Sequence, residues 1–137
     1  VERISKLSNV ISINGGVQLD LMGQENAEST GTRQLSGVGG QMDFLEGAYR
    51  SKGGKGFICI NSSRVTKDGE RKSNILATIP GGSTISAPRT MIQYVATEYG
   101  IASLSGKTLR ERAEAMASIA HPDFREELMK YARENFK

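Results

Sequence analysis

A run of glycines in the sequence stands where the backbone could hold a negatively charged group. Ser36-Gly37-Val38-Gly39-Gly40 lies directly before Gln41, where an apolar pattern with helical spacing begins. Glycine lets the backbone approach a ligand closely, and the free N–H groups at a helix start favour a phosphate or a developing oxyanion. A tight loop before a helix, with no ligand, fits the same residues, so both interpretations stay open.

The spacing of these glycines excludes two common nucleotide sites. The dinucleotide-binding pattern needs a further glycine where Met42 stands, and it follows a strand rather than a polar stretch. A second glycine cluster, Gly53-Gly54-Lys55-Gly56, lacks the Gly-x4-Gly-Lys-Ser/Thr spacing of a P-loop. A helix C-cap and turn is the simpler interpretation of that cluster.

One carboxylate follows an apolar segment. Glu98, in Thr97-Glu98-Tyr99-Gly100, comes after a strand expected over 91–96 that Gly100 ends. Open α/β sheets bind ligands beyond the carboxyl ends of their strands, so Glu98 is a candidate site residue. A helix cap or a surface ion pair is the alternative.

Histidine and cysteine, the residues most typical of zinc sites, are nearly absent. His121 is the only histidine and Cys59 the only cysteine. A metal site needs several such ligands, so the sequence predicts none. We expect His121 to be a cap or a structural histidine, and Cys59, in the apolar run 57–60, to be a buried thiol.

The elements that must position these residues follow from apolar spacing. A helix is expected over 41–51, with Phe44, Leu45, Ala48 and Tyr49 on its buried face. The polar residues 23–40 read as one long loop. Strands are expected over 17–22, 57–60, 74–79, 84–86 and 91–96.

Two helices are expected at the C-terminal end of the chain. Thr108 and Glu111 form the pattern of a capping box, and Asp123 and Glu126 repeat it after Pro122. Strands followed by helices predict an α/β fold with helices packed on a sheet.

Length, composition and charge narrow the class of protein. The 137 residues are enough for one domain. The net charge of +3 comes without a dense Lys/Arg stripe, so we do not expect a nucleic-acid partner. No apolar run is long enough to span a membrane and no signal peptide is visible, and with the single cysteine we expect a cytoplasmic protein.

Three segments in order carry a family resemblance: SGVGGQMDF, ATEYGIA and IAHPDFREEL. From about Ile11 onward, the chain resembles the C-terminal domain of the acetyl-CoA hydrolase/transferase family, most of all the 4-hydroxybutyrate and butyryl-CoA:acetate CoA-transferases. The resemblance implies an open, mostly parallel twisted sheet with helices packed on it. It also implies that residues 1–137 are the C-terminal part of a longer enzyme, without its N-terminal domain and nucleophile region.

The resemblance further implies a reaction and its site residues. Such enzymes move CoA between short-chain carboxylic acids through a glutamyl-CoA thioester, and the nucleophilic glutamate lies upstream of this chain. Acyl-CoA and a short-chain carboxylate are the substrates, with no tightly bound cofactor, and a homodimer is allowed. Asn14, Gly54 and Glu98 take supporting catalytic roles, and the expected CoA contacts are Gly37, Gly39, Gly40, Gln41, Lys67 and Gly69.

Departures from the family pattern leave the acyl substrate open. They lie at 61–64, 73–77 and 104–106. An acyl-CoA hydrolase and a non-catalytic module that binds CoA or a protein therefore remain alternatives to a transferase.

Overall fold

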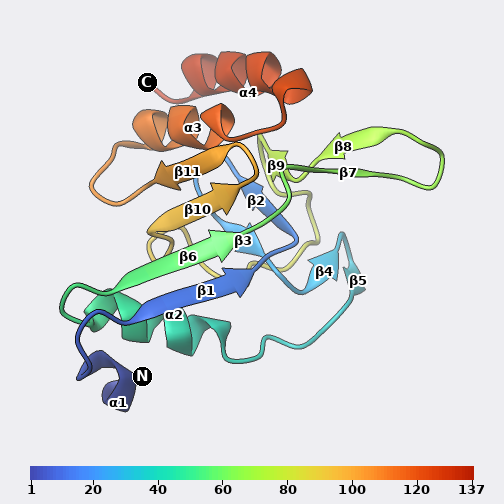
Figure 1. Cartoon of the computed structure of the whole chain (residues 1–137). Coiled ribbons are helices and arrows are strands. Elements are labelled where there is room, and N and C mark those ends of the chain that lie inside the picture. Colours follow the sequence, from blue (N-terminus) through green and yellow to red (C-terminus); the bar gives the residue numbers. More distant parts are fainter.

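A four-stranded sheet forms the centre of the molecule, in strand order β1-β6-β10-β11 (Figure 1). In this computed structural model, which describes all residues 1–137, β1, β6 and β10 run parallel and β11 runs antiparallel to β10. The α/β class and the open, largely parallel sheet are therefore confirmed. The bounds of its strands are β1 Ile11–Gly15, β6 Lys55–Cys59, β10 Tyr94–Thr97 and β11 Gly100–Ser103.

Smaller sheets lie beside the main one. β2 pairs with β3 and, in parallel, with β9, while β4–β5 and β7–β8 are two antiparallel hairpins. Their bounds are β2 Gln18–Asp20, β3 Glu25–Asn26, β4 Ser29–Thr30, β5 Arg33–Gln34, β7 Ser63–Val65, β8 Arg71–Ser73 and β9 Ile75–Leu76.

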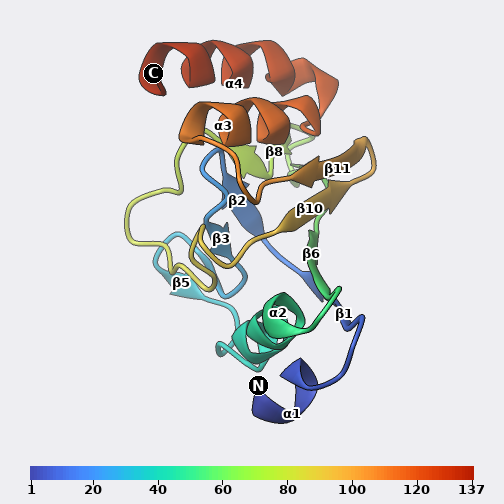
Figure 2. The ribbon, with the colours of Figure 1, turned by 90° about the vertical axis from the view of Figure 1, so that its left-hand side faces the viewer.

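The helices cover one side and one end of the main sheet. α2 packs behind β1 and β6, and α3 and α4 stack beyond β11 (Figures 1 and 2). A single apolar core joins these layers, with Leu45 of α2, Ile58 and Val95 of the sheet and Met116 of α3 all fully or almost fully buried. The bounds are α1 Glu2–Ser5, α2 Gln41–Arg50, α3 Leu109–Ser118 and α4 Pro122–Asn135. None of these helices is long and apolar enough to cross a membrane.

One face of the main sheet has no cover. In Figure 2 the strands lie edge-on, and nothing packs on the side away from α2. Ile13 and Ile101 on this face are 68% and 62% exposed, and the stacked rings of Phe57 and Tyr94 lie between them in the strand register. Sheets built of parallel strands are normally covered on both faces, so this face is unusual for an isolated domain.

The expected long loop over 23–40 is wrong, because a buried polar network orders its first half. Asn26 is fully buried, and its Oδ1 accepts hydrogen bonds from the N–H groups of Glu28 and Ser29, each at 3.0 Å, and from Thr84 Oγ1 at 3.1 Å. These bonds pair the buried polar groups of the segment and so order it. Because the contacts are polar, the spacing of apolar residues does not predict them. Residues 84–86, expected as a strand, serve this network instead and form no strand.

Three other local expectations need correction. Gly100 does not end a strand region but begins β11, after a tight turn at Glu98 and Tyr99. Phe44 and Tyr49 are 51% and 54% exposed, and Gly47, against which Ile4 of α1 lies, is buried together with Leu45 and Ala48 instead. The strand expected over 74–79 is only the two residues of β9.

Both C-terminal helices begin where expected, and one cap differs. Thr108 and Glu111 form the capping box of α3, with the Glu111 N–H donating to Thr108 Oγ1 and the Thr108 N–H to Glu111 Oε2. At α4 the second capping box is absent. His121 is the N-cap there, and its Nδ1 accepts from the Asp123 N–H at 3.2 Å.

Candidate active site

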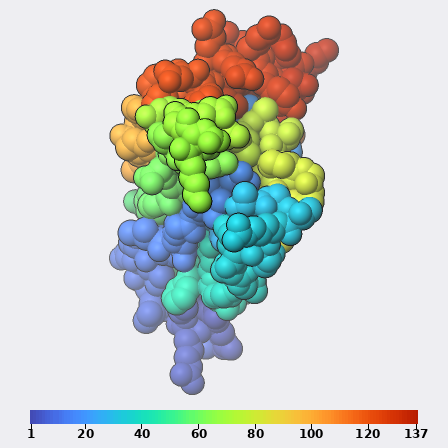
Figure 3. All heavy atoms as spheres, turned by 90° about the vertical axis from the view of Figure 1, so that its right-hand side faces the viewer, coloured from blue at the N-terminus to red at the C-terminus, as the bar shows by residue number.

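The carboxyl ends of β1, β6 and β10 meet at one edge of the sheet, because the three strands are parallel and in register. This edge, which we call the C-terminal edge, carries a shallow depression of about 460 Å³, lined by Gly16, Cys59, Ile60, Asn61, Ala96 and Thr97. Figure 3 views the molecule from this side, with the β7–β8 and β4–β5 hairpins projecting on either side of it. Ligands of open α/β sheets bind at such an edge.

Glu98 lies at this edge, where the sequence predicted it. It follows the last residue of β10, and its carboxylate accepts two hydrogen bonds from Ser62, from the N–H at 2.8 Å and from Oγ at 2.6 Å. Partial burial alone would raise the pKa of Glu98, but the bonds from Ser62 outweigh it and hold the pKa below its usual value, with a smaller contribution from His121. The side chain is therefore an oriented, ionised carboxylate.

Asn14 reaches the same edge from β1. It pairs with Ile58 in the strand register, one residue before the end of each strand. Its Nδ2 donates to Ser12 Oγ at 2.8 Å, so the amide is oriented while its oxygen accepts no hydrogen bond within the chain. The structure thus brings Asn14 and Glu98 to one edge from two different strands.

The glycine-rich segment forms an exposed loop leading into α2. Gly37 and Gly39 have open space around them, and Gly39 has φ +59°. Gln41, the first residue of α2, donates from Nε2 to Glu25 Oε2. The other oxygen of Glu25 lies against Gly16, where a Cβ atom would come within 2.7 Å of it. Through these contacts the loop is tied to the end of β1.

Gly54 does not join this group. It immediately precedes Lys55, the first residue of β6, and therefore lies at the opposite edge of the sheet from Asn14 and Glu98. A Cβ atom at Gly54 would lie 2.1 Å from the Ala48 carbonyl oxygen and 2.8 Å from Ser51 Cβ. A glycine is required at this position because the turn from α2 into β6 leaves no space for a side chain.

Lys67 and Gly69 lie at the tip of the β7–β8 hairpin. Both are exposed, and Gly69 takes φ +82° in the turn, where its N–H donates to the Thr66 carbonyl at 3.0 Å. The hairpin itself was not predicted, although the turn was. It projects beside the C-terminal edge, so both residues are free to contact a ligand (Figures 1 and 3).

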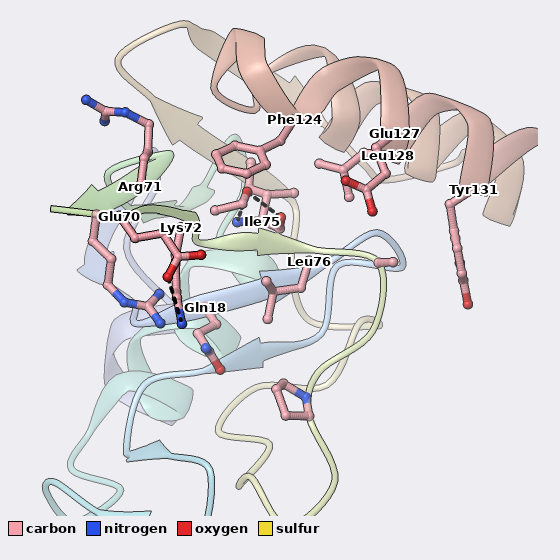
Figure 4. A pocket seen from close by; sticks show the side chains of 14 residues that line it. Gln18, Glu70, Arg71, Lys72, Ile75, Leu76, Phe124, Glu127, Leu128 and Tyr131 are labelled. Atoms are coloured by element: carbon pink, nitrogen blue, oxygen red, sulfur yellow. Dashed lines mark hydrogen bonds and ion pairs between the residues drawn. The ribbon is translucent and has the colours of Figure 1, made fainter. Parts of the chain in front are cut away.

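A second cavity, of about 440 Å³, lies between this hairpin and α4. Arg64, Arg71 and Lys72 line it from the hairpin, while Phe124 and Tyr131 project from α4 toward β9 (Figure 4). The basic groups are bonded locally: Arg64 Nη1 donates to Asn74 Oδ1 at 2.7 Å, and Arg71 Nη1 to Ser63 Oγ at 2.9 Å. Glu98 and Asn14 do not line this cavity.

The prediction of a buried thiol is wrong for Cys59, and the prediction of a cap is confirmed for His121. Cys59 is half-buried rather than buried, because β6 turns its side chain to the uncovered face beside the depression. His121 is a helix cap, which confirms the structural interpretation. No group of three or more His, Cys, Asp or Glu side chains is arranged to hold a metal ion.

Two residues near the C-terminal edge were not predicted from the sequence. Ser62, which fixes Glu98, is fully buried and lies 36 residues before it in the chain. Glu25 lies in a polar segment with no apolar spacing. Neither leaves a local signal, because each acts through a contact that only the fold creates.

The fold and the C-terminal edge together define an α/β ligand-binding domain with a carboxylate, an amide and a glycine-rich loop at one sheet edge. A family model described as "Acetyl-CoA hydrolase/transferase C-terminal domain" matches residues 1–132. The chain therefore belongs to this family and is its C-terminal domain.

Relatives of known name agree with this assignment. The chain is 48% identical to butyryl-CoA:acetate CoA-transferase of Anaerostipes caccae over 96% of its length. It is 50% identical to 4-hydroxybutyrate coenzyme A transferase of Clostridium kluyveri over 97%. It spans only 30% of the length of each of these two relatives.

Solved structures also resemble the chain. RipA from Yersinia pestis superposes with a TM-score of 0.84 at 40% identity, covering 97% of this chain and 29% of that one. A 4-hydroxybutyrate CoA-transferase from Porphyromonas gingivalis gives a TM-score of 0.75 at 41% identity, covering 98% and 29%.

Proposed function

We propose that this domain is part of a CoA-transferase that moves CoA between short-chain carboxylic acids of the butyrate, 4-hydroxybutyrate or acetate type. The observation that carries the proposal is the identity of 48% and 50% with two transferases of those names, over nearly the whole chain.

The reaction proceeds in two balanced exchanges. A glutamate carboxylate from the upstream part of the protein attacks the acyl-CoA carbonyl, forming an acyl-glutamyl anhydride and expelling the CoA thiolate. The thiolate then attacks the glutamyl carbonyl, giving glutamyl-CoA and the free carboxylate of the first acid. A second carboxylate reverses both steps and leaves as its CoA thioester.

This chain orients the reacting groups. Glu98, ionised and fixed by Ser62, stands at the C-terminal edge, where its charge would raise the pKa of an adjacent glutamate. Asn14 presents an amide to the reacting carboxylate from β1. Gly54, at the opposite edge, supports the start of β6 rather than touching the reacting atoms.

CoA itself binds along the projecting loops. The backbone of Gly37, Gly39 and Gly40 and the start of α2 at Gln41 offer N–H groups to an anion. Lys67, with Gly69, offers a positive charge at the hairpin tip for a phosphate of CoA.

The uncovered face of the main sheet supports a larger protein. Ile13, Phe57, Tyr94 and Ile101 form an apolar surface that a further part of the polypeptide would bury. We propose that the N-terminal domain packs on this face. We also propose that the whole enzyme is cytoplasmic and that it can form a homodimer.

Two alternatives have some support. A hydrolase would pass the CoA thioester to water, and an acetyl-CoA hydrolase of Kluyveromyces lactis is 32% identical over 124 residues. A CoA-binding module without turnover would need only the loop contacts.

The test uses the full-length protein and follows CoA transfer from acetyl-CoA to butyrate and to 4-hydroxybutyrate. Transfer that requires the acid acceptor supports the transferase. Release of free CoA without an acceptor favours the hydrolase, and CoA binding without either reaction favours the module. The Glu98→Gln variant, which keeps the shape but removes the charge, should lower kcat more than it raises KM.

A further inference from the structure

The most unusual side chain in the molecule is the carboxyl group of Glu25. It is fully buried on β3, and its Oε1 has no hydrogen-bond partner. Buried polar groups are almost always paired, and each exception needs an explanation. The nucleophile chemistry proposed above makes no use of this group.

Glu25 lies between two parts of the candidate active site. On one side its Oε2 accepts a hydrogen bond from Gln41 Nε2, at the start of α2 and directly after the glycine-rich loop. On the other side Oε1 lies against Gly16, which lines the depression at the C-terminal edge. Its own backbone is fixed by hydrogen bonds with Ser86 and Ala87.

The loop has few other anchors. Gly37 and Gly39 touch nothing within 4 Å of an added Cβ atom, and Gly40 meets only Phe44 of its own helix. The start of the loop is held by the Ser36 N–H, which donates to the Glu28 carbonyl at 3.2 Å, and the side chain of Gln41 is the contact that fixes its end next to the sheet edge.

We propose that Glu25 is a positioning residue of the candidate active site: through Gln41 its buried carboxyl group fixes the glycine-rich loop against the end of β1. The consequence for CoA binding rests on the proposed function, in which this loop contacts CoA. The positioning itself does not.

The surroundings of Glu25 make the neutral form the stable one. Burial raises its pKa from 4.5 to about 7, the hydrogen bond from Gln41 opposes this rise, and the charge of Glu28 adds to it. Glu28 is the charged group that acts on Glu25, while Gln41, Gly16 and Ala87, which approach from the neighbouring elements, are uncharged.

The sign of the pH effect follows from these contacts. Below about pH 7 the buried carboxyl keeps its proton and the loop stays anchored. As the pH rises through this value, a charged oxygen without a partner must reach water. The contact of Oε1 with Gly16 then opens, and because the Gln41 side chain is bonded to the same carboxyl group, the glycine-rich loop is displaced with it.

The first test follows the loop directly in the 137-residue chain by NMR. Between about pH 5 and pH 9, the amides of Gly39, Gly40 and the Gln41 side chain should shift together, with a midpoint near 7. Glu25→Gln, whose amide oxygen can still accept from Gln41 but carries no charge, should abolish this transition. A transition that survives in Glu25→Gln, or is missing in the unmodified chain, overturns the proposal.

Two matched variants locate the titrating group. Glu28→Gln removes the neighbouring charge and should keep the transition but lower its midpoint. Histidine side chains also change charge in this range, so His121→Gln should leave the loop transition unchanged. Loss of the transition in His121→Gln alone would also overturn the assignment.

The second test measures the affinity for coenzyme A by calorimetry near pH 6 and pH 8. Between pH 6 and pH 8 the Kd of the unmodified chain should rise by up to about tenfold, because one proton is involved. CoA itself also changes charge in this range, and Glu25→Gln measures that contribution. The rise in the unmodified chain should therefore exceed the rise in Glu25→Gln. Equal pH dependence in both chains contradicts the link to ligand binding. If neither chain binds CoA, the proposed CoA contact fails, while the NMR transition still decides the positioning role.

Discussion

Arg112 offers the sharpest test of how the domain holds together, because it is a buried cation with no carboxylate partner. The side chain is 9% exposed on α3. Its guanidinium donates to three backbone carbonyls: Nε to Met22 at 2.9 Å, Nη1 to Leu104 at 3.0 Å and Nη2 to Arg89 at 2.7 Å. One side chain thereby joins α3 to the turn after β2, the end of β11 and the loop before β10.

The expected effect of Arg112→Met follows from these bonds. Three hydrogen bonds from a charged donor contribute about 1.5–3 kcal/mol each, and the desolvation of the guanidinium offsets several kcal/mol of that sum. We expect a net loss of about 3–4 kcal/mol, since three carbonyls also lose their donors. That loss corresponds to a decrease in Tm of roughly 12–16 °C for a domain of this size.

The assay is urea unfolding at neutral pH, with the m-value compared to confirm two-state behaviour. Arg112→Lys separates charge from geometry, because an ammonium group cannot reach all three carbonyls at once. It should be destabilised nearly as much as Arg112→Met. Arg110→Met is the control: Arg110 is exposed on the same helix and pairs with Glu114 at 3.1 Å, so the change should be at most about 0.5 kcal/mol. A loss below about 1 kcal/mol in Arg112→Met would refute the reasoning.

Three further predictions concern other features. Thr108→Ala removes the capping box of α3 and should lower the free energy of unfolding by about 1 kcal/mol, measured by urea unfolding. Gly54→Ala should cost about 1–3 kcal/mol because the new methyl group meets the Ala48 carbonyl. Gly37→Ala, in open space, should change stability by less than about 0.5 kcal/mol. The double variant Ile13→Asp, Ile101→Asp should weaken association of this domain with a separately expressed N-terminal part, measured by calorimetry, while Val65→Asp, equally apolar and 56% exposed elsewhere, should not.

The parts of the fold that depend on neighbouring residues could be predicted from the sequence. The capping box at Thr108, the start of α4 at Pro122 and the strands around Val17 and Ile58 are local patterns. Glu98 was placed correctly because an apolar strand precedes it. The glycine-rich loop was identified from its glycines before a helix and Asn14 by family resemblance, and the structure places both close to that edge.

The parts that depend on distant contacts could not be predicted. β3 and β4 are held by Asn26 and Thr84, which lie far apart in the sequence. The buried face of α2 includes Gly47, against which Ile4 of α1 lies, and the position of Gly54 at the opposite edge follows only from the parallel direction of β6. Apolar periodicity does not record such long-range polar pairing.

The strand order β1-β6-β10 also has a consequence for how the chain acquires its shape. During synthesis β1 leaves the ribosome well before β6, the only strand of the main sheet with which it pairs. Until then Ile11 and Ile13 have no partner, and an unpaired apolar strand is prone to aggregate. α2 is completed between the two strands and packs on both, so its early formation would cover the other face of β1 while Ile11 and Ile13 stay exposed until β6 pairs with the strand.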